Sequence, residues 1–145
     1  MAEMIPESQG RIRLIETAAP GAPAQVVIAQ DARVRWRLMS FTVDFITDVA
    51  IADRGVHLMI MYGPNVVALF PARAVQAASL TRTYCFSPVG QDTIITATDT
   101  IAGQIPEWYL LNNEVTIQTD VVDMDVMDYF GISYLMVEEW IEPLV

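Results

Sequence analysis

Short runs that alternate apolar and polar residues make up most of the chain, and turn residues separate them. Arg11–Glu16 and Glu114–Thr119 have this period of two, and Val56–Tyr62 is joined to Val66–Phe70 by a Gly-Pro-Asn turn, as in a β-hairpin. Further strands are expected at Ala24–Gln30, Val34–Thr47, Ser79–Ser87, Thr93–Thr98 and Ser133–Glu142. About eight to ten short strands predict an all-β fold, a two-sheet antiparallel sandwich of jelly-roll or related topology.

The long run Val34–Thr47 changes the phase of its alternation halfway along. Its first part places Trp36 and Leu38 on one face, and its second part moves the apolar residues to the other face. One extra residue, a β-bulge near Met39-Ser40, would restore a single apolar face. Trp36 and Leu38 are therefore predicted to lie in the core.

Length and hydropathy predict one domain. Residues 1–10 are expected to form a flexible N-terminal arm, and residues 11–145 a single β-sandwich domain in which Ala72–Ala78 forms a short helical turn. No apolar run reaches the ~18 residues that cross a bilayer, and the first residues lack the basic and apolar segments of a secretory signal. The protein is therefore expected to be made in a cytosol and to stay out of the membrane.

Acidic residues outnumber basic residues by 18 to 8, which gives a formal net charge of −10. Nucleic-acid affinity comes mainly from Lys and Arg that neutralise phosphates, so no nucleic-acid partner is expected, and an anionic membrane surface is disfavoured for the same reason. All the basic residues are arginines. Arginine pairs bidentately with carboxylates and suits protein interfaces, although a lineage bias in codon use explains the same composition equally well.

The residue types that usually carry catalysis are scarce. Cys85 is the only cysteine and His57 the only histidine, and both lie in apolar strand patterns, where a buried thiol and a structural imidazole are expected. Glu138 and Glu139 are adjacent on a strand, so they point to opposite faces and cannot flank one glycosidic bond. The sequence contains no Gly-rich phosphate loop and no Cys/His cluster. We therefore expect a non-enzymatic protein without cofactor or metal.

The segment Asp120–Asp128 contains four carboxylates in nine residues. Hard cations such as Ca²⁺ bind several oxygens at short range, but the segment lacks the glycine and the terminal glutamate of a Ca²⁺ loop. A cation site is therefore the second interpretation. The first is a solvated or interface loop whose acids face outward while its apolar residues dock: Val121, Met124, Val126 and Met127.

Three segments together resemble a broad set of small proteins of tailed bacteriophages. They are Val34–Ser40 (VRWRLMS), Ala78–Pro88 (ASLTRTYCFSP) and Leu135–Glu142 (LMVEEWIE), which are similar to a W-R-L-L-S strand, an A-S-L-T-x-T-Y-x-F-x-P strand and a closing V-E-E-W. Ile105–Leu110 (IPEWYL) is similar to the L-P-x-L-Y-L step before their penultimate strand. The resemblance covers residues 24–142 and departs at the acidic segment, where those proteins have a stretch with more glycine.

The resemblance implies a virion structural protein with a β-sandwich fold and no catalytic residues to carry over. Small acidic all-β domains of virions are similar to capsid cement or decoration proteins, which bind the outer shell as oligomers and tie capsomers together. The expected partners are the major capsid protein or other virion proteins, and the expected location is a virion made in the host cytoplasm. The alternative is a receptor- or glycan-binding domain of a tail or head fibre, with a site at Trp108, Tyr109, Asn112, Asn113 and Glu114.

An excess of apolar residues predicts association between copies. Val56–Tyr62 is apolar on both faces apart from His57, yet only one face of a strand meets the core of a sandwich. A symmetric homo-oligomer, most simply a trimer on the threefold positions of an icosahedral shell, would bury the second face. The two arginines of the predicted interface are expected near acids of a neighbouring copy. The candidate interface residues are Arg35, Arg37, His57, Met59, Met61, Tyr134, Met136 and Trp140.

Overall fold

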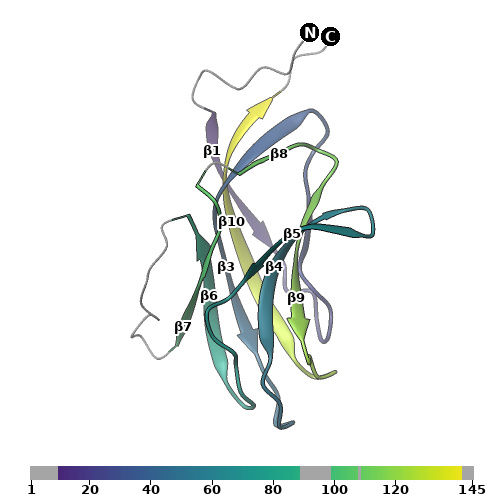
Figure 1. Cartoon of the computed structure of the whole chain (residues 1–145), viewed down its shortest axis with the longest axis vertical. Coiled ribbons are helices and arrows are strands. Elements are labelled where there is room, and N and C mark those ends of the chain that lie inside the picture. Colours follow the sequence, from purple (N-terminus) through teal and green to yellow (C-terminus); the bar gives the residue numbers. More distant parts are fainter. Residues whose placement is uncertain (1–9, 89–98, 108, 142–145) are drawn as a thin grey trace.

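The computed structural model describes residues 10–88, 99–107 and 109–141, and in this part of the chain all regular structure is β-strand (Figure 1). The strands are β1 (Arg11–Thr17), β2 (Val27–Ala29), β3 (Val34–Ile46), β4 (Gly55–Tyr62), β5 (Asn65–Pro71), β6 (Thr81–Ser87), β7 (Thr100–Gln104), β8 (Leu110–Leu111), β9 (Thr116–Val122) and β10 (Tyr129–Ile141). Sheet A has the order β1-β10-β3-β6-β7, with β8 paired to β3, and sheet B has the order β2-β9-β4-β5. The two-sheet sandwich predicted from the sequence is confirmed.

The chain passes between the sheets in a jelly-roll-type order. Strands β1, β3 and β6 enter sheet A, β2, β4 and β5 enter sheet B, and then β9 returns to sheet B before β10 closes sheet A. β10 lies between β1 and β3, and β9 lies between β2 and β4, so the last two strands complete both sheets. The departure from antiparallel pairing is β7, which runs parallel to β6.

The β-bulge expected in the third strand is present. Met136 lies opposite Ser40 and Val137 lies opposite Leu38, so Met39 has no partner on β10. The extra residue returns the apolar side chains after it to the core face. Trp36 and Leu38 are 1% and 0% exposed, which confirms the prediction that they are core residues.

Long apolar side chains from both inner faces form one core. The largest fully buried apolar side chains include Trp36, Leu38, Phe41, Phe45, Leu58, Ile60, Tyr84, Phe86, Ile105, Ile117 and Phe130. Gly103 allows β7 to lie against this core, because a Cβ there would come within 2.3 Å of the Phe86 ring. Such a close approach of the Gly103 backbone to the Phe86 ring is typical of a tightly packed interior.

Two local features differ from the sequence prediction, and two predicted segments lie outside the described residues. Ala72–Ala78 does not form the expected helical turn: its backbone makes isolated bridges, Ala72 to Gly103 and Gln76 to Arg54. β7 forms a strand where none was predicted, whereas the strand predicted at Thr93–Thr98 lies outside the described residues. Residues 1–9 of the expected arm also lie outside them.

Candidate functional site

The edge strand β1 has inverted polarity. Ile12 and Leu14 point to solvent and are 55% and 59% exposed. Arg13 turns toward the buried carboxylate of Glu139, and Arg11, whose side chain is 65% exposed, pairs with it from the rim of the sheet. A solvated strand usually directs its apolar side chains inward and its charges outward. In the first half of β1 the arrangement is reversed at Ile12, Arg13 and Leu14, whereas Ile15 packs against the core.

The Glu139 carboxylate holds β1 and β3 to β10. It accepts a hydrogen bond from Trp36 Nε1 at 2.8 Å and one from Arg13 Nη1 at 2.9 Å, and it also pairs with Arg11. Trp36 and Arg11 are the residues opposite Glu139 on the two neighbouring strands. Burial by itself would raise the pKa of Glu139, but the hydrogen bonds from Trp36, Arg11 and Arg13 outweigh it and lower this pKa. The carboxylate is therefore held ionised inside the sandwich.

The neighbouring carboxylate, Glu138, is paired on the other face of β10. Arg37 Nε donates to Glu138 Oε1 at 2.9 Å, and the backbone N–H of Gly10 donates to Glu138 Oε2 at 2.9 Å. Burial raises the pKa of Glu138, and the hydrogen bonds from Arg37 and Gly10 lower it by more, so the net shift is downward. Arg37 therefore has an acidic partner in its own chain, where the sequence predicted one in a neighbouring copy.

A contiguous apolar surface lies on the outer face of β1 and β10. It consists of Ile12 and Leu14 with Ile132, Tyr134 and Met136, which occupy successive outward positions on the two strands. Ile132 and Tyr134 are 48% and 40% exposed, and Met136 is half-buried. We call these five residues the β1–β10 patch.

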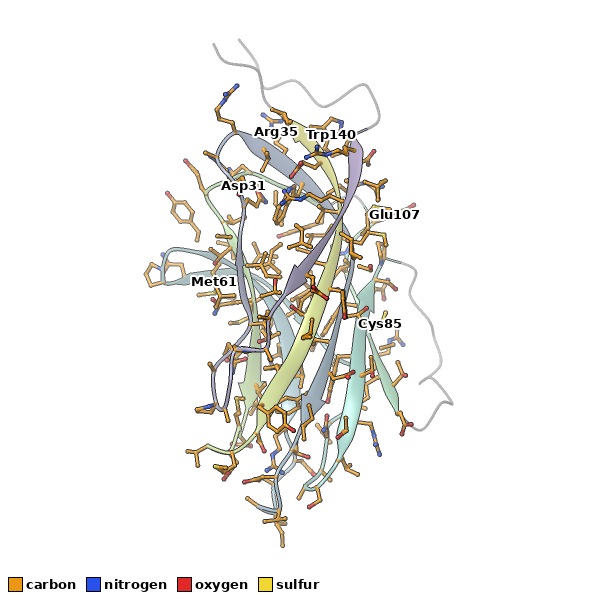
Figure 2. All side chains as sticks on the ribbon, turned by 180° about the vertical axis from the view of Figure 1, so that it is seen from behind. Asp31, Arg35, Met61, Cys85, Glu107 and Trp140 are labelled. Atoms are coloured by element: carbon orange, nitrogen blue, oxygen red, sulfur yellow. The ribbon has the colours of Figure 1, made fainter. Side chains whose placement is uncertain are left out.

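The structure divides the eight predicted interface residues between the two sheets. Those on the outer face of sheet A are Arg35, Arg37, Tyr134, Met136 and Trp140, and those on the outer face of sheet B are His57, Met59 and Met61. Figure 2 shows Arg35 and Trp140 together near one end of sheet A, with Met61 well away from them. Met59 is only 7% exposed. The predicted set is therefore two surfaces.

A second polar network, which the sequence did not predict, lies at the other end of β10. The Arg54 guanidinium is fully buried and donates to both oxygens of Asp128, at 2.9 and 3.2 Å, to Asp48 Oδ1 at 2.9 Å and to the Ala52 carbonyl at 2.7 Å. The backbone N–H groups of Asp48 and Asp125 also donate to Asp128. The sequence did not predict that Arg54 is buried, because it lies in an Asp-Arg-Gly segment typical of a turn, and turns are normally solvated.

The pKa values of two carboxylates in this network, Asp128 and Asp48, are shifted in opposite directions. Burial raises the pKa of Asp128, but the hydrogen bonds from Asp48 N–H, Arg54 and Asp125 N–H lower it by more. The pKa of Asp48 is raised, chiefly by its side-chain hydrogen bond with Asp125.

The acidic segment differs from the loop that was expected. Asp128 is 0% exposed rather than outward-facing, and Val126 and Met127 are 69% and 63% exposed rather than docked. Val121 is buried, as expected. The network of Arg54 explains the difference. Its buried guanidinium draws Asp128 inward and leaves Val126 and Met127 exposed at the tip of the loop.

The remaining candidates carry little chemistry. Tyr109 packs edge-on against Phe70 with ring centroids 5.5 Å apart, and Trp108 lies outside the described residues. Cys85 is half-buried on the outer face of sheet A, where a buried thiol was expected. A shallow depression of about 490 Å³ is lined by Arg37, Met39, Pro88 and Glu107.

The described residues contain no group of three or more His, Cys, Asp or Glu side chains placed to hold a metal ion. They also contain no helix long and apolar enough to span a membrane.

Comparisons with protein-family models, curated proteins and solved structures found no match for this chain. The class that the structure defines is therefore a fold class, an all-β sandwich of two packed sheets.

Proposed function

We propose that this protein is a non-enzymatic structural protein of a tailed-phage virion, of the capsid cement or decoration type, which docks on the outer shell through the β1–β10 patch. The proposed partner is the major capsid protein or another virion protein. The resemblance of three strand segments to small phage proteins supports the assignment to a virion, and the inverted polarity of β1 supports the choice of docking surface.

The inversion of β1 is the observation that carries the proposal. An edge strand in water normally keeps its apolar side chains inward, and an exposed apolar surface at a sheet edge favours unwanted pairing. Here Arg13 and the buried Glu139 pair on the inner side, with the exposed Arg11 reaching the same carboxylate from the rim, and Ile12 and Leu14 face outward beside Met136. An apolar centre of this kind, surrounded by polar residues, is the composition of a protein–protein interface.

The jelly-roll-type order is compatible with this function and with the alternative. Such folds occur in viral capsid domains and in lectins, and a fold by itself does not define a function. For the glycan-binding alternative, the described part of the candidate site supplies less than the sequence suggested. Tyr109 packs on Phe70, and the side chain of Asn112 accepts a hydrogen bond from the Glu114 backbone.

Co-sedimentation with empty capsids purified from a panel of tailed phages tests the proposal. We expect saturable binding to at least one capsid, and we expect Leu14→Lys to reduce it because a charge would enter the apolar contact. Val75→Lys is the matched control, since Val75 is 60% exposed, similar to Leu14, and lies in the β5–β6 connection. Both variants should melt like the wild type, because both side chains are exposed.

Three outcomes contradict the proposal. Failure to bind any capsid, together with binding to a glycan array, would favour the fibre-domain alternative. Equal loss of binding in Leu14→Lys and Val75→Lys would remove the β1–β10 patch as the docking surface. Loss in Ile51→Lys alone would move the contact to the loop tip formed by Val49, Ile51, Val126 and Met127.

A further inference from the structure

The longest stretch of the sequence without Asp, Glu or Arg is Gly55–Ala72. It forms β4, the Tyr62–Asn65 turn and β5, and Figure 1 shows the turn of this hairpin projecting beyond the body of the sandwich. In a chain with a formal net charge of −10, this segment lies within the longest part of the sequence free of carboxylates, Arg54–Gln91.

Exposed apolar side chains are concentrated at the turn end of this hairpin and along β5. Tyr62, Val66, Val67 and Leu69 are 52%, 53%, 55% and 47% exposed. A bulge contributes to the exposure: Met61 lies opposite Val66 and Ile60 lies opposite Ala68, so Val67 has no partner on β4. We call Tyr62, Val66, Val67 and Leu69 the β5 edge patch.

The second edge of β5 has no neighbouring strand in the described structure, because β5 ends sheet B. Free sheet edges are usually protected by charged side chains, and β5 has none. Its far end is bounded by Pro71 and by the bridge of Ala72 to Gly103 in β7. The β5 edge patch belongs to sheet B and the β1–β10 patch to the outer face of sheet A, so the two patches are separate surfaces.

We propose that the β5 edge patch is a self-association surface, and that its occupant is the same patch of a second copy of this chain. The argument is electrostatic. Two copies that each carry −10 repel, and the repulsion is least where neither copy presents a carboxylate. The loop tip is as apolar, but it stands on Asp48, Asp125 and Asp128, and two tips would bring these acids together.

Pairing through β5 is isologous. Two identical strands that meet antiparallel about a twofold axis place Val66, Val67 and Leu69 against the same residues of the second copy, and the free backbone groups of β5 can continue the ladder. The contact closes at two copies. A threefold ring would instead need two different surfaces on each copy, so this geometry gives a dimer where the sequence suggested a trimer.

Light scattering and sedimentation velocity across about 1 µM to 1 mM protein test this proposal. We expect a mass that rises from one copy to two. Raising NaCl from about 0.01 to 0.3 M is expected to strengthen the dimer, because salt shortens the range of the repulsion between the copies. Val67→Lys should weaken it about tenfold or more, because two like charges then meet at the twofold axis.

Lysine substitutions at two positions distinguish the effect of the β5 edge patch from the effect of net charge alone. Val67→Lys and Val75→Lys change the charge of the chain equally, and both positions are exposed valines. If repulsion alone limited association, both variants would dimerise better than the wild type. We expect only Val67→Lys to lose the dimer, with Val75→Lys dimerising at least as well as the wild type, and both keeping the wild-type melting temperature.

A chain that stays monomeric at high concentration, a mass of three copies, or equal behaviour of the two valine variants would overturn the proposal. Leu14→Lys distinguishes it from the proposed shell docking, since that variant should lose capsid binding and keep the dimer. Conversely, Val67→Lys should sediment with capsids as a monomer.

Discussion

Replacing Arg54 by methionine removes the centre of the network at the lower end of β10. The methionine side chain fills much of the same volume but donates no hydrogen bond, so the fully buried Asp128 carboxylate keeps only two backbone N–H partners. The wild-type guanidinium makes two hydrogen bonds to Asp128, one to Asp48 and one to the Ala52 carbonyl. The variant therefore leaves a charge inside the protein without its counter-charge.

The magnitude follows from this loss. Removing one partner of a buried ion pair costs about 3–5 kcal/mol. For a chain of this length, 1 kcal/mol corresponds to a shift of about 2–4 °C in the melting temperature, so a cost of about 4 kcal/mol predicts a decrease of roughly 8–16 °C. Urea unfolding followed by tryptophan fluorescence measures the free energy of unfolding directly. An unchanged slope of this free energy against urea concentration would show that the wild type and Arg54→Met expose similar surface on unfolding.

Two further variants make the test specific. Arg82→Met removes a pair with Asp99 whose atoms are 3.6 Å apart and whose acid is 79% exposed, and it should cost less than about 1 kcal/mol. The double variant Arg54→Met with Asp128→Leu removes both buried charges and should be more stable than Arg54→Met alone. A cost below about 1 kcal/mol for Arg54→Met, or no recovery in the double variant, would refute the reasoning.

Four other outcomes are expected. Trp36→Ala should cost about 3–5 kcal/mol by urea unfolding and Trp36→Phe clearly less, since a phenyl ring still fills much of the site and only part of the indole volume and the hydrogen bond to Glu139 are lost. Equal losses would be inconsistent with packing as the main contribution. Gly103→Ala should lower stability by about 1–3 kcal/mol, because the new methyl group overlaps the Phe86 ring, and an unchanged melting temperature would contradict that contact. Asp128, Glu138 and Glu139, whose pKa values are lowered, stabilise the fold above about pH 4 and lose this contribution as the pH falls through their folded-state pKa values, whereas Asp48, whose pKa is raised, acts in the opposite direction. Because three groups oppose one, the urea midpoint should fall on acidification below about pH 4, and a flat profile would count against the networks. Millimolar Ca²⁺ should leave the melting temperature unchanged, and a rise of several degrees would reveal a cation site in Asp120–Asp128.

The fold was predictable because its signals are local. Period-two alternation and turn residues are properties of neighbouring positions, so the hairpin of β4 and β5 and the bulge at Met39 were both found from the sequence. β7 was missed because Thr100–Gln104 is a short, partly polar run that becomes a strand by pairing with β6. The parallel pairing itself is set by the topology of the sheet, which no local pattern reports.

The candidate site was less predictable because side chains far apart in the sequence create it. The alternation of the last strand places Glu139 on the face of Leu135 and Val137, which is where it lies, but its partners come from β1 and β3. The alternation of β1 was visible, whereas the choice of its inner face depended on that buried carboxylate. Arg54 and Asp128 are joined for the same reason, across 74 positions of sequence. The trimer and the phage resemblance stay predictions.

The two polar networks also bear on how the exposed apolar surfaces would bind. One network joins β1, β3 and β10 through Glu139, near the end of β10, and the other fixes the loops that precede β4 and β10 through Arg54 and Asp128. Each ties segments that would otherwise move independently, and both lie beside strands that present apolar residues to solvent. A partner that docks on such surfaces does not have to order them first, so less of the binding free energy is lost to conformational entropy. Buried charge of this kind contributes little net stability compared with apolar packing of the same volume. Its physical advantage in this sandwich is therefore the fixed orientation that it gives to β1 and to the loops that precede β4 and β10.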